Sequence, residues 1–182
     1  MKPRINLKTG LLLAGVLVVI SLVAVYWFNQ TNSSQPRVKL PAFQLVDVEG
    51  KTFHLSGTSS KPTVIHFMAV ACGGSFASIN DVRLRELVKV KNVLGDDVEI
   101  ITVLVTTCTT TDLAELKRYY NVTWTFGNDY DDSKLDILEA FKSYDLTDGS
   151  LIIGTSQNNF AELIRDEVDA ETLIGKLDGL LG

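Results

Sequence analysis

The chain has 182 residues, of which 46% are hydrophobic and 21% charged, and a net charge of −5 at pH 7, so one folded domain with an ordinary core is expected. The body of the sequence has no concentrated basic face to neutralise phosphates, which excludes nucleic acid as a partner. Two cysteines are too few for a disulfide scaffold and fit no structural zinc spacing, so neither a metal nor another cofactor is predicted.

An uncharged run of 19 residues, 10–28, lies near the N-terminus. At 1.5 Å per residue a helix of this length spans about 28 Å, the thickness of a bilayer's hydrocarbon core, so we expect a transmembrane anchor. Basic residues precede the run, and the first basic residue after it is Arg37. The positive-inside rule therefore places residues 1–9 in the cytoplasm and the chain after the anchor on the outer side of the cell membrane. No small-x-small cleavage site follows, which favours an uncleaved anchor over a signal peptide. Residues 29–38 are polar and predict a flexible stalk to a domain at 39–182.

Within that domain the hydrophobic periodicity predicts short strands alternating with helices. Two alternating stretches around Glu49-Gly50 indicate a leading β-hairpin. The later predicted elements are a strand at 64–68, a helix at 75–94, a strand at 98–105, a helix at 112–120 opened by a capping box of Asp112 and Glu115, a helix at 133–144, strands at 151–154 and 160–165, and a last helix with Leu173, Leu177 and Leu181 on one face. The order strand, helix, strand, helix implies that the first two buried strands are parallel. The predicted class is therefore α/β, a βαβ unit followed by ββα around a mixed central sheet.

Cys72 follows the first buried strand and precedes the helix expected from Ser75. At a helix start, unpaired N–H groups and the helix dipole stabilise a thiolate, so this position favours a nucleophilic cysteine. The alternative is a small buried thiol that only fills space.

Cys108 follows the second buried strand, in the run TTCTTTD at 106–112. Loops after two neighbouring parallel strands emerge at the same edge of a sheet, so Cys72 and Cys108 can approach each other. A disulfide needs a Cα separation of about 4.4–6.8 Å, which such loop residues can reach without being required to. A functional pair and an unrelated loop thiol therefore both stay open, although an oxidising compartment favours pairing.

Three stretches resemble a known group of proteins: PAFQLVDVEGKTFHLS at 41–56, KPTVIHFMAVACGGS at 61–75 and VEIITVLV at 98–105. They are similar to the hairpin, the active-site strand with its turn, and the second strand of the membrane-anchored thioredoxin-like proteins of the TlpA/ResA group, within the wider redoxin superfamily. The resemblance covers about residues 39–182. It implies a thioredoxin-like fold and thiol-disulfide exchange with a protein partner through Cys72.

The sequence also departs from that pattern. Ser75 stands where the second cysteine of CxxC is expected, so a monothiol CxxS site remains unless Cys108 resolves it. Ser150 stands where the family has a cis-proline, which puts substrate docking in doubt. His66 aligns with a buried acid that accepts a proton near the cysteines, and a histidine there can do the same at neutral pH. The alternative for His66 is a core histidine bonded to the backbone.

Two further hypotheses belong to other functional classes. Sco-type copper proteins share the expected fold. In this chain, soft or imidazole ligands for Cu(I) could come from Cys72, Cys108, Met68 and His66. The C-x-x-x-C spacing of the Sco-type proteins is absent, however, and no histidine follows His66. The lost second cysteine and proline are also compatible with a non-catalytic docking or assembly module of a membrane complex. The leading hypothesis is a single-pass membrane protein whose extracytoplasmic domain exchanges disulfides through Cys72, with Cys108 completing the redox pair.

Overall fold

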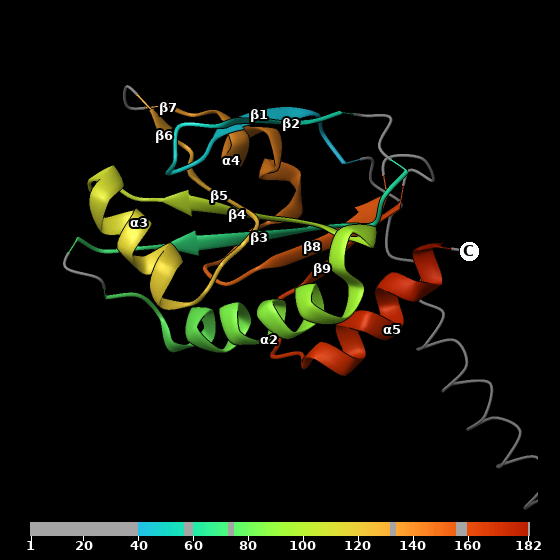
Figure 1. The fold of residues 1–182 in the computed structure, drawn as a ribbon. Coiled ribbons are helices and arrows are strands. Elements are labelled where there is room, and N and C mark those ends of the chain that lie inside the picture. Colours follow the sequence, from blue (N-terminus) through green and yellow to red (C-terminus); the bar gives the residue numbers. More distant parts are fainter. Residues whose placement is uncertain (1–39, 57–59, 73–74, 132–133, 156–159, 182) are drawn as a thin grey trace, which may run out of the picture. The chain divides into compact units, whose positions relative to one another are not determined.

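Figure 1 shows the computed structural model of the chain, which describes residues 40–56, 60–72, 75–131, 134–155 and 160–181. The anchor and stalk predicted at 10–28 and 29–38 lie outside these ranges. Within the ranges, no helix has both the length and the apolar character needed to cross a bilayer.

The domain is built on a five-stranded mixed sheet with the order β5-β4-β3-β8-β9. The strands are β3 (Thr63–Ala69), β4 (Glu99–Val105), β5 (Thr125–Asn128), β8 (Leu151–Thr155) and β9 (Phe160–Ile164). Strands β3, β4 and β5 are parallel, whereas β8 runs antiparallel to both β3 and β9. The predicted α/β class and the parallel pair are therefore confirmed. Strand β5 was not predicted, because it is short and ends in Gly127 and Asn128, which are poor strand formers.

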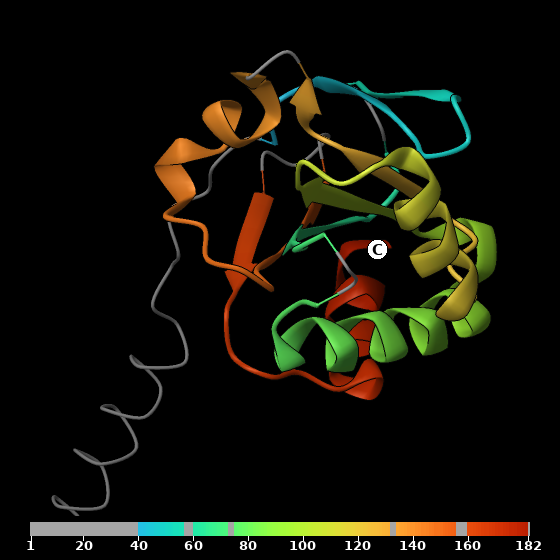
Figure 2. The ribbon, with the colours of Figure 1, turned by 90° about the vertical axis from the view of Figure 1, so that its left-hand side faces the viewer.

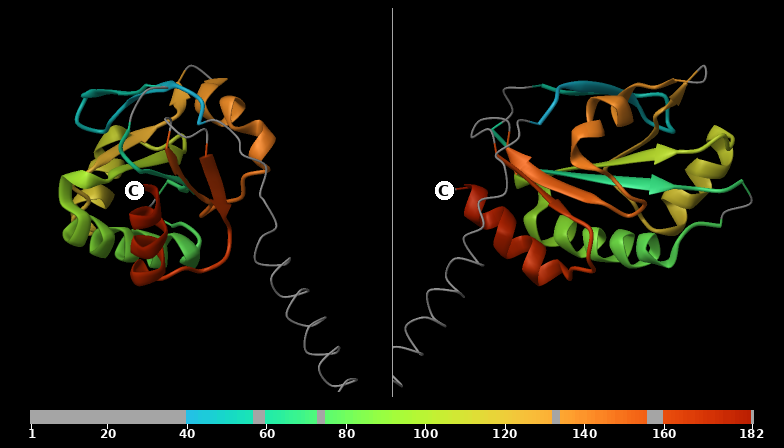
Figure 3. Two further views of the ribbon diagram at one scale, coloured as in Figure 1. Left: turned by 90° about the vertical axis from the view of Figure 1, so that its right-hand side faces the viewer. Right: turned by 180° about the vertical axis from the view of Figure 1, so that it is seen from behind.

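Layers of other elements cover the two faces of this sheet (Figures 1 and 3). On one side lie α2 (Ser78–Leu94) and α5 (Ala170–Leu181), and on the other lie the hairpin of β1 (Phe43–Val46) and β2 (Thr52–Leu55) and the short α4 (Asp136–Ala140). Alternate residues of β3 serve the two layers: Val64 and Met68 pack in the cluster that includes Leu87 of α2, and Ile65 and Phe67 pack with Phe141 below the hairpin. Helix α3 (Thr110–Tyr119) joins the α2 cluster through Leu113. The remaining short elements are η1 (Gly95–Asp97), β6 (Tyr130–Asp131), β7 (Lys134–Leu135) and η2 (Lys142–Tyr144).

The leading hairpin is confirmed, and it is fastened to the edge of the sheet. Val48 N–H donates to the Phe126 carbonyl of β5 at 3.0 Å, and Asp47 pairs with Gly127 as a single antiparallel bridge. A Cβ atom on Gly127 would overlap the Val46 carbonyl oxygen. Only glycine therefore lets the hairpin backbone approach β5 this closely.

Three helix predictions need correction. Helix α2 begins at Ser78 instead of Ser75, because the Ser75 carbonyl accepts the Ala71 N–H in an antiparallel bridge that precedes the helix. Helix α3 begins at Thr110, since its N-cap is Thr109, whose hydroxyl oxygen accepts the Asp112 N–H, so the predicted capping box was placed three residues too late. The helix predicted at 133–144 is divided among β7, α4 and η2.

The last helix buries only part of its predicted face. Leu173 and Leu177 are fully buried, but Leu181 is 50% exposed.

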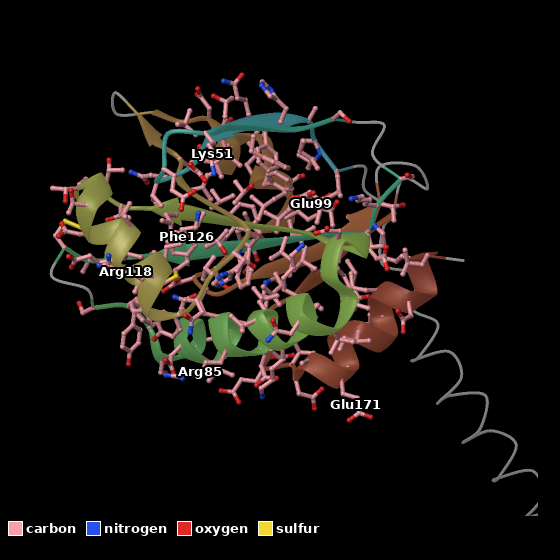
Figure 4. All side chains as sticks on the ribbon, viewed as in Figure 1. Lys51, Arg85, Glu99, Arg118, Phe126 and Glu171 are labelled. Carbon is pink, nitrogen blue, oxygen red and sulfur yellow. A yellow bond between two sulfur atoms is a disulfide. The ribbon has the colours of Figure 1, made fainter. Side chains whose placement is uncertain are left out.

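Arg83 of α2 is fully buried, although it carries a positive charge. Its Nε donates to the Gly149 carbonyl at 3.2 Å, and its Nη2 donates to the carbonyls of Arg165, at 3.3 Å, and of Asp166. One guanidinium thus joins α2 to the segments that precede β8 and follow β9. By contrast, the side chains of Arg85 and Arg118 lie at the surface (Figure 4).

Candidate functional site

The two cysteines form a disulfide at the carboxyl ends of β3 and β4, with their Cα atoms 5.0 Å apart. The last paired residues of these strands are Ala69 and Val105, and each cysteine lies three residues beyond its own strand. The strand register pairs residues 36 apart, and the cysteines are also separated by 36 positions. The disulfide therefore continues the register of the parallel pair past Ala69 and Val105.

Cys72 lies exposed in a turn and not at a helix start, so that prediction is wrong. The turn is closed by an antiparallel bridge in which the Ala71 N–H donates to the Ser75 carbonyl at 2.8 Å. Ser75, at the position of the missing second cysteine, thus closes the turn through its backbone carbonyl. It lies three residues before the start of α2. The dipole of α2 begins too far along the chain to support a Cys72 thiolate in the way the sequence suggested.

Cys108 instead occupies the position next to a helix start. It directly precedes Thr109, the N-cap of α3, and it is half-buried. The Thr106 hydroxyl donates to Cys108 Sγ at 2.8 Å, and its oxygen accepts the Cys108 N–H at 3.1 Å. On the other sulfur, the Thr107 hydroxyl lies 3.8 Å from Cys72 Sγ. A thiolate on Cys108 would therefore have a hydroxyl donor and the positive end of a helix dipole beside it.

His66 is fully buried in β3, and its partner is an asparagine. Its Nε2 lies 3.0 Å from Asn80 Oδ1, while Asn80 Nδ2 donates to Asp148 Oδ1 at 2.8 Å. Because the Asn80 oxygen is thus the acceptor, the histidine proton lies on Nε2. Desolvation by burial lowers the pKa of His66 to about 4, so the ring is neutral at pH 7.

Among the described residues, no hydrogen bond joins His66 to either sulfur. The ring lies three residues before the end of β3, which corresponds to roughly 10 Å along the strand. Its role as proton acceptor for Cys72 remains a prediction, and the structure gives the ring a structural partner in Asn80.

Ser150 is buried, and the backbone around it is fully engaged within the domain. Its N–H donates to the Thr147 carbonyl and its carbonyl accepts the Phe67 N–H, both at 3.0 Å. At Gly149, the N–H donates to the Phe67 carbonyl at 2.9 Å and the carbonyl accepts Arg83 Nε. Each of these four backbone groups therefore has a hydrogen-bond partner within the domain, at the position where the resembling family has a cis-proline.

The ligands considered for copper are not gathered in one place. Met68 is fully buried in the α2 cluster, His66 bonds Asn80, and the two cysteines are bonded to each other. Among the residues that the structure describes, no group of three or more His, Cys, Asp and Glu side chains is arranged to hold a metal ion.

A pocket of about 580 Å³ opens beside Cys108. Its walls come from the hairpin, the start of α3, the end of β5 and the start of α4, elements that Figure 2 shows from the side of the molecule at which β3 and β4 end. Cys108 and Thr110 form its wall on the disulfide side, and Asp47, Asp129 and Asp136 also line it. We call this cavity the Cys108 pocket.

Comparisons with known proteins find the likeness in structure. No protein-family model matches the sequence, and no curated protein sequence matches it. A thioredoxin-family thiol:disulfide interchange protein from Chlorobium tepidum TLS superposes with a TM-score of 0.67 at 13% identity, covering 82% of this chain and 100% of that chain. The fold is thioredoxin-like.

Two further thioredoxin-like structures agree. A secreted Mycobacterium tuberculosis disulfide oxidoreductase homologous to E. coli DsbE has a TM-score of 0.60 at 14% identity, covering 75% of this chain and 95% of its own. StoA from Bacillus subtilis has a TM-score of 0.56 at 16% identity, covering 77% of this chain and 98% of its own. At these identities the likeness is one of fold, and the disulfide between Cys72 and Cys108 is an observation on this chain itself.

The sequence did not reveal the polar groups that support the site. Thr106 and Thr107 belong to a run of threonines, and only the position of Cys108 within that run hinted that their hydroxyls lie near sulfur. Asp148 gave no signal, because its two donors, Ala69 N–H and Asn80 Nδ2, are both about 70–80 residues distant in the chain.

Proposed function

We propose that this protein is a membrane-anchored, extracytoplasmic thiol-disulfide exchange protein, similar to the TlpA/ResA group, that acts on a protein partner through Cys72 and Cys108. The observation that carries the proposal is the disulfide at the strand edge, in which one sulfur belongs to an exposed residue and the other to a half-buried one. An attacking thiolate reaches the exposed sulfur more readily, so Cys72 is the entry point and Cys108 the resolving cysteine.

The exchange proceeds in two steps. A partner thiolate attacks Cys72 Sγ, the Cys72–Cys108 bond breaks, and its electron pair leaves on Cys108 as a thiolate. A second partner thiolate then attacks the partner sulfur of the mixed disulfide and releases Cys72. The partner has formed a disulfide, and this protein has gained two electrons and, once both thiolates are protonated, two protons. The same steps in reverse reduce a partner disulfide.

The surroundings of Cys108 suit it to the role of leaving group in the first step. The Thr106 hydroxyl and the N-terminus of α3 both stabilise negative charge on its sulfur. A better stabilised leaving thiolate departs faster. The family's CxxC design places both cysteines in one turn, whereas here the second cysteine comes from the loop after the neighbouring strand, so the exchange needs no cysteine at position 75.

The membrane part of the proposal rests on the 19-residue uncharged run and its basic flank. Protease added to spheroplasts should digest the domain while a cytoplasmic marker protein in the same cells stays intact. Protection of the domain until the membrane is lysed would contradict this topology.

The exchange itself is tested by trapping. The variant Cys108→Ser cannot resolve a mixed disulfide, so it should accumulate partner adducts on Cys72 that mass spectrometry identifies after alkylation. The control variant Cys72→Ser should accumulate far fewer. If neither variant forms adducts and wild-type thiols stay reduced under mild oxidation, the docking-module hypothesis replaces this one. Retention of Cu(I) by the reduced protein against a chelator, without adducts, would instead favour the copper hypothesis.

A further inference from the structure

One residue, Thr106, links Cys108 to the neighbouring strand β5. The Thr106 hydroxyl donates to Cys108 Sγ at 2.8 Å and accepts the Cys108 N–H at 3.1 Å. The Thr106 main chain is bonded on its other side to the carboxamide of Asn128. The Thr106 N–H donates to Asn128 Oδ1 at 3.3 Å, and Asn128 Nδ2 donates to the Thr106 carbonyl at 2.9 Å. The carboxamide of Asn128 is therefore connected to the sulfur of Cys108 through a single residue.

The side chain of Asn128 acts here in place of main chain. Strands β4 and β5 pair in a register that places Leu104 opposite Asn128, and a continued β5 would place Tyr130 opposite Thr106. Tyr130 instead pairs with Leu135 of β7. A carboxamide has a donor and an acceptor, as a peptide group does, so Asn128 supplies the two bonds that a longer strand would have given to Thr106.

This pair of bonds determines where the Thr106 hydroxyl points. Threonine is branched at Cβ and stiff at χ1, so a fixed main chain also fixes the direction of its hydroxyl. Thr106 is buried, and an aliphatic residue in place of Asn128 would take both main-chain partners away from it. An aspartate would retain the acceptor but would set a second acceptor against the Thr106 carbonyl. An asparagine side chain satisfies both main-chain groups at once.

We propose that Asn128 is a positioning residue for thiol-disulfide exchange, which fixes the Thr106 main chain so that the Thr106 hydroxyl is aimed at Cys108 Sγ. This role rests on the proposed function, in which Cys108 is the leaving group. Asn128 neither bonds the sulfur nor transfers a proton. It sets the direction of the hydrogen bond that stabilises the electron pair on Cys108 when the bond to Cys72 breaks.

The first measurement is the rate of Cys108 alkylation against pH in the reduced Cys72→Ser protein, in which Cys108 is the only cysteine. Asn128→Ala should raise the midpoint of this profile by about half to one pH unit, the shift expected when one hydrogen bond to the thiolate is misaligned. Asn128 and Cys108 both line the Cys108 pocket, so in this variant water can reach the Thr106 main chain from the pocket and the fold is retained. Asn128→Leu, which has a similar side-chain volume, should give the same shift and replaces alanine if that variant does not fold.

The second measurement shows whether Asn128 acts through Thr106. In the protein with both cysteines, Asn128→Ala should slow reduction of the disulfide by a small thiol about 3–5-fold. In a Thr106→Val background the same replacement should change the rate less than twofold, because the hydroxyl that Asn128 orients is gone. Asn92→Ala is the matched control, since it removes a carboxamide from an exposed position of α2, and it should change neither the rate nor the midpoint.

A purely structural role for Asn128 would give a different pattern. The melting temperature of Asn128→Ala would fall, but the alkylation midpoint of Cys108 would stay in place. An unchanged midpoint, or equal slowing by Asn128→Ala with and without the Thr106 hydroxyl, overturns the inference. If the midpoint shifts and Cys108→Ser traps no partner adducts, the proposed function fails, and the role of Asn128 in exchange fails with it. If adducts form and the midpoint does not shift, only the role of Asn128 fails.

Discussion

The Thr106 hydroxyl donates to Cys108 Sγ at 2.8 Å, whereas the corresponding hydroxyl of Thr107 lies 3.8 Å from Cys72 Sγ. The two sulfurs of one disulfide therefore differ in how well their thiolates would be stabilised. This difference favours Cys108 over Cys72 as the leaving thiolate when the disulfide is reduced.

Replacing Thr106 by valine should slow reduction of the disulfide by a small thiol about 3–10-fold. The variant removes one hydrogen bond to the leaving sulfur, which contributes roughly 0.5–1.5 kcal/mol. The rate is measured by trapping the released thiols over time. Thr107→Val is the matched control and should change the rate less than twofold. Equal slowing in both variants would show that Cys108 is not the preferred leaving group.

Reduction of the disulfide should lower the melting temperature of the domain by roughly 10 °C. The bond closes a loop between positions 36 apart, and the chain-entropy model assigns such a loop about 3–4 kcal/mol. Scanning calorimetry with and without reductant measures the shift. The double variant Cys72→Ser/Cys108→Ser serves as control, since reductant should leave it unchanged. A wild-type protein that melts at the same temperature in both states would contradict the pairing.

The free energy of unfolding should fall as the pH decreases from about 6.5 to about 4 because of His66. Burial holds the pKa of the folded-state ring at about 4, so over this interval the unfolded chain binds a proton that the folded chain does not. The contribution of the neutral His66 ring to the free energy of unfolding is complete above pH 6.5 and is lost progressively on acidification. Below pH 4 the titration of His66 causes no further change. The total loss is about 3 kcal/mol. Urea titrations at several pH values measure it.

The variant His66→Gln tests the origin of that pH dependence. It should be less stable at pH 7, because the ring's packing and its bond to Asn80 are changed, and it should lack most of the slope between pH 6.5 and 4. A slope equal to that of the wild-type protein would assign the effect to carboxylates instead of to His66.

Gly127→Ala should destabilise the domain by about 1–3 kcal/mol. The added methyl group would overlap the Val46 carbonyl oxygen and the Leu45 side chain, which forces the hairpin away from β5. Gly175→Ala is a matched control in α5, where nothing lies within 4 Å of the added atom, and it should stabilise the helix by about 0.5–1 kcal/mol. Denaturant titration of both variants gives the comparison, and tolerance of alanine at position 127 would contradict the close docking of the hairpin.

The sequence predicted the elements whose patterns are strong and local. The hairpin around Gly50 and the buried strands β3, β4 and β8 follow from alternation and from continuous apolar runs. The edge strand β5 was missed because four residues with a glycine carry no such pattern. The start of α2 was wrong because the bridge between Ala71 and Ser75 depends on backbone pairing, which side-chain periodicity does not report.

The sequence predicted that the two cysteines lie close together and left a disulfide and an unrelated loop thiol both open, and the structure shows the disulfide. Cys72 and Cys108 each follow a parallel strand, so both lie at one edge of the sheet. The register between β3 and β4 decides whether their sulfurs come within bonding distance. The polar chain from His66 through Asn80 to Asp148 joins three segments that are far apart in sequence, so no local signal announces it.

The burial of Arg83 has a consequence for how the domain opens. Its guanidinium holds the carbonyls of Gly149 before β8 and of Arg165 and Asp166 after β9. Separating the β8–β9 pair from α2 would leave a cation among apolar side chains with its acceptors gone, a state that is far costlier than the loss of ordinary packing. The β8–β9 pair and α2 should therefore open as one cooperative unit. In hydrogen exchange, the slow amides of these three elements would then share a single opening free energy.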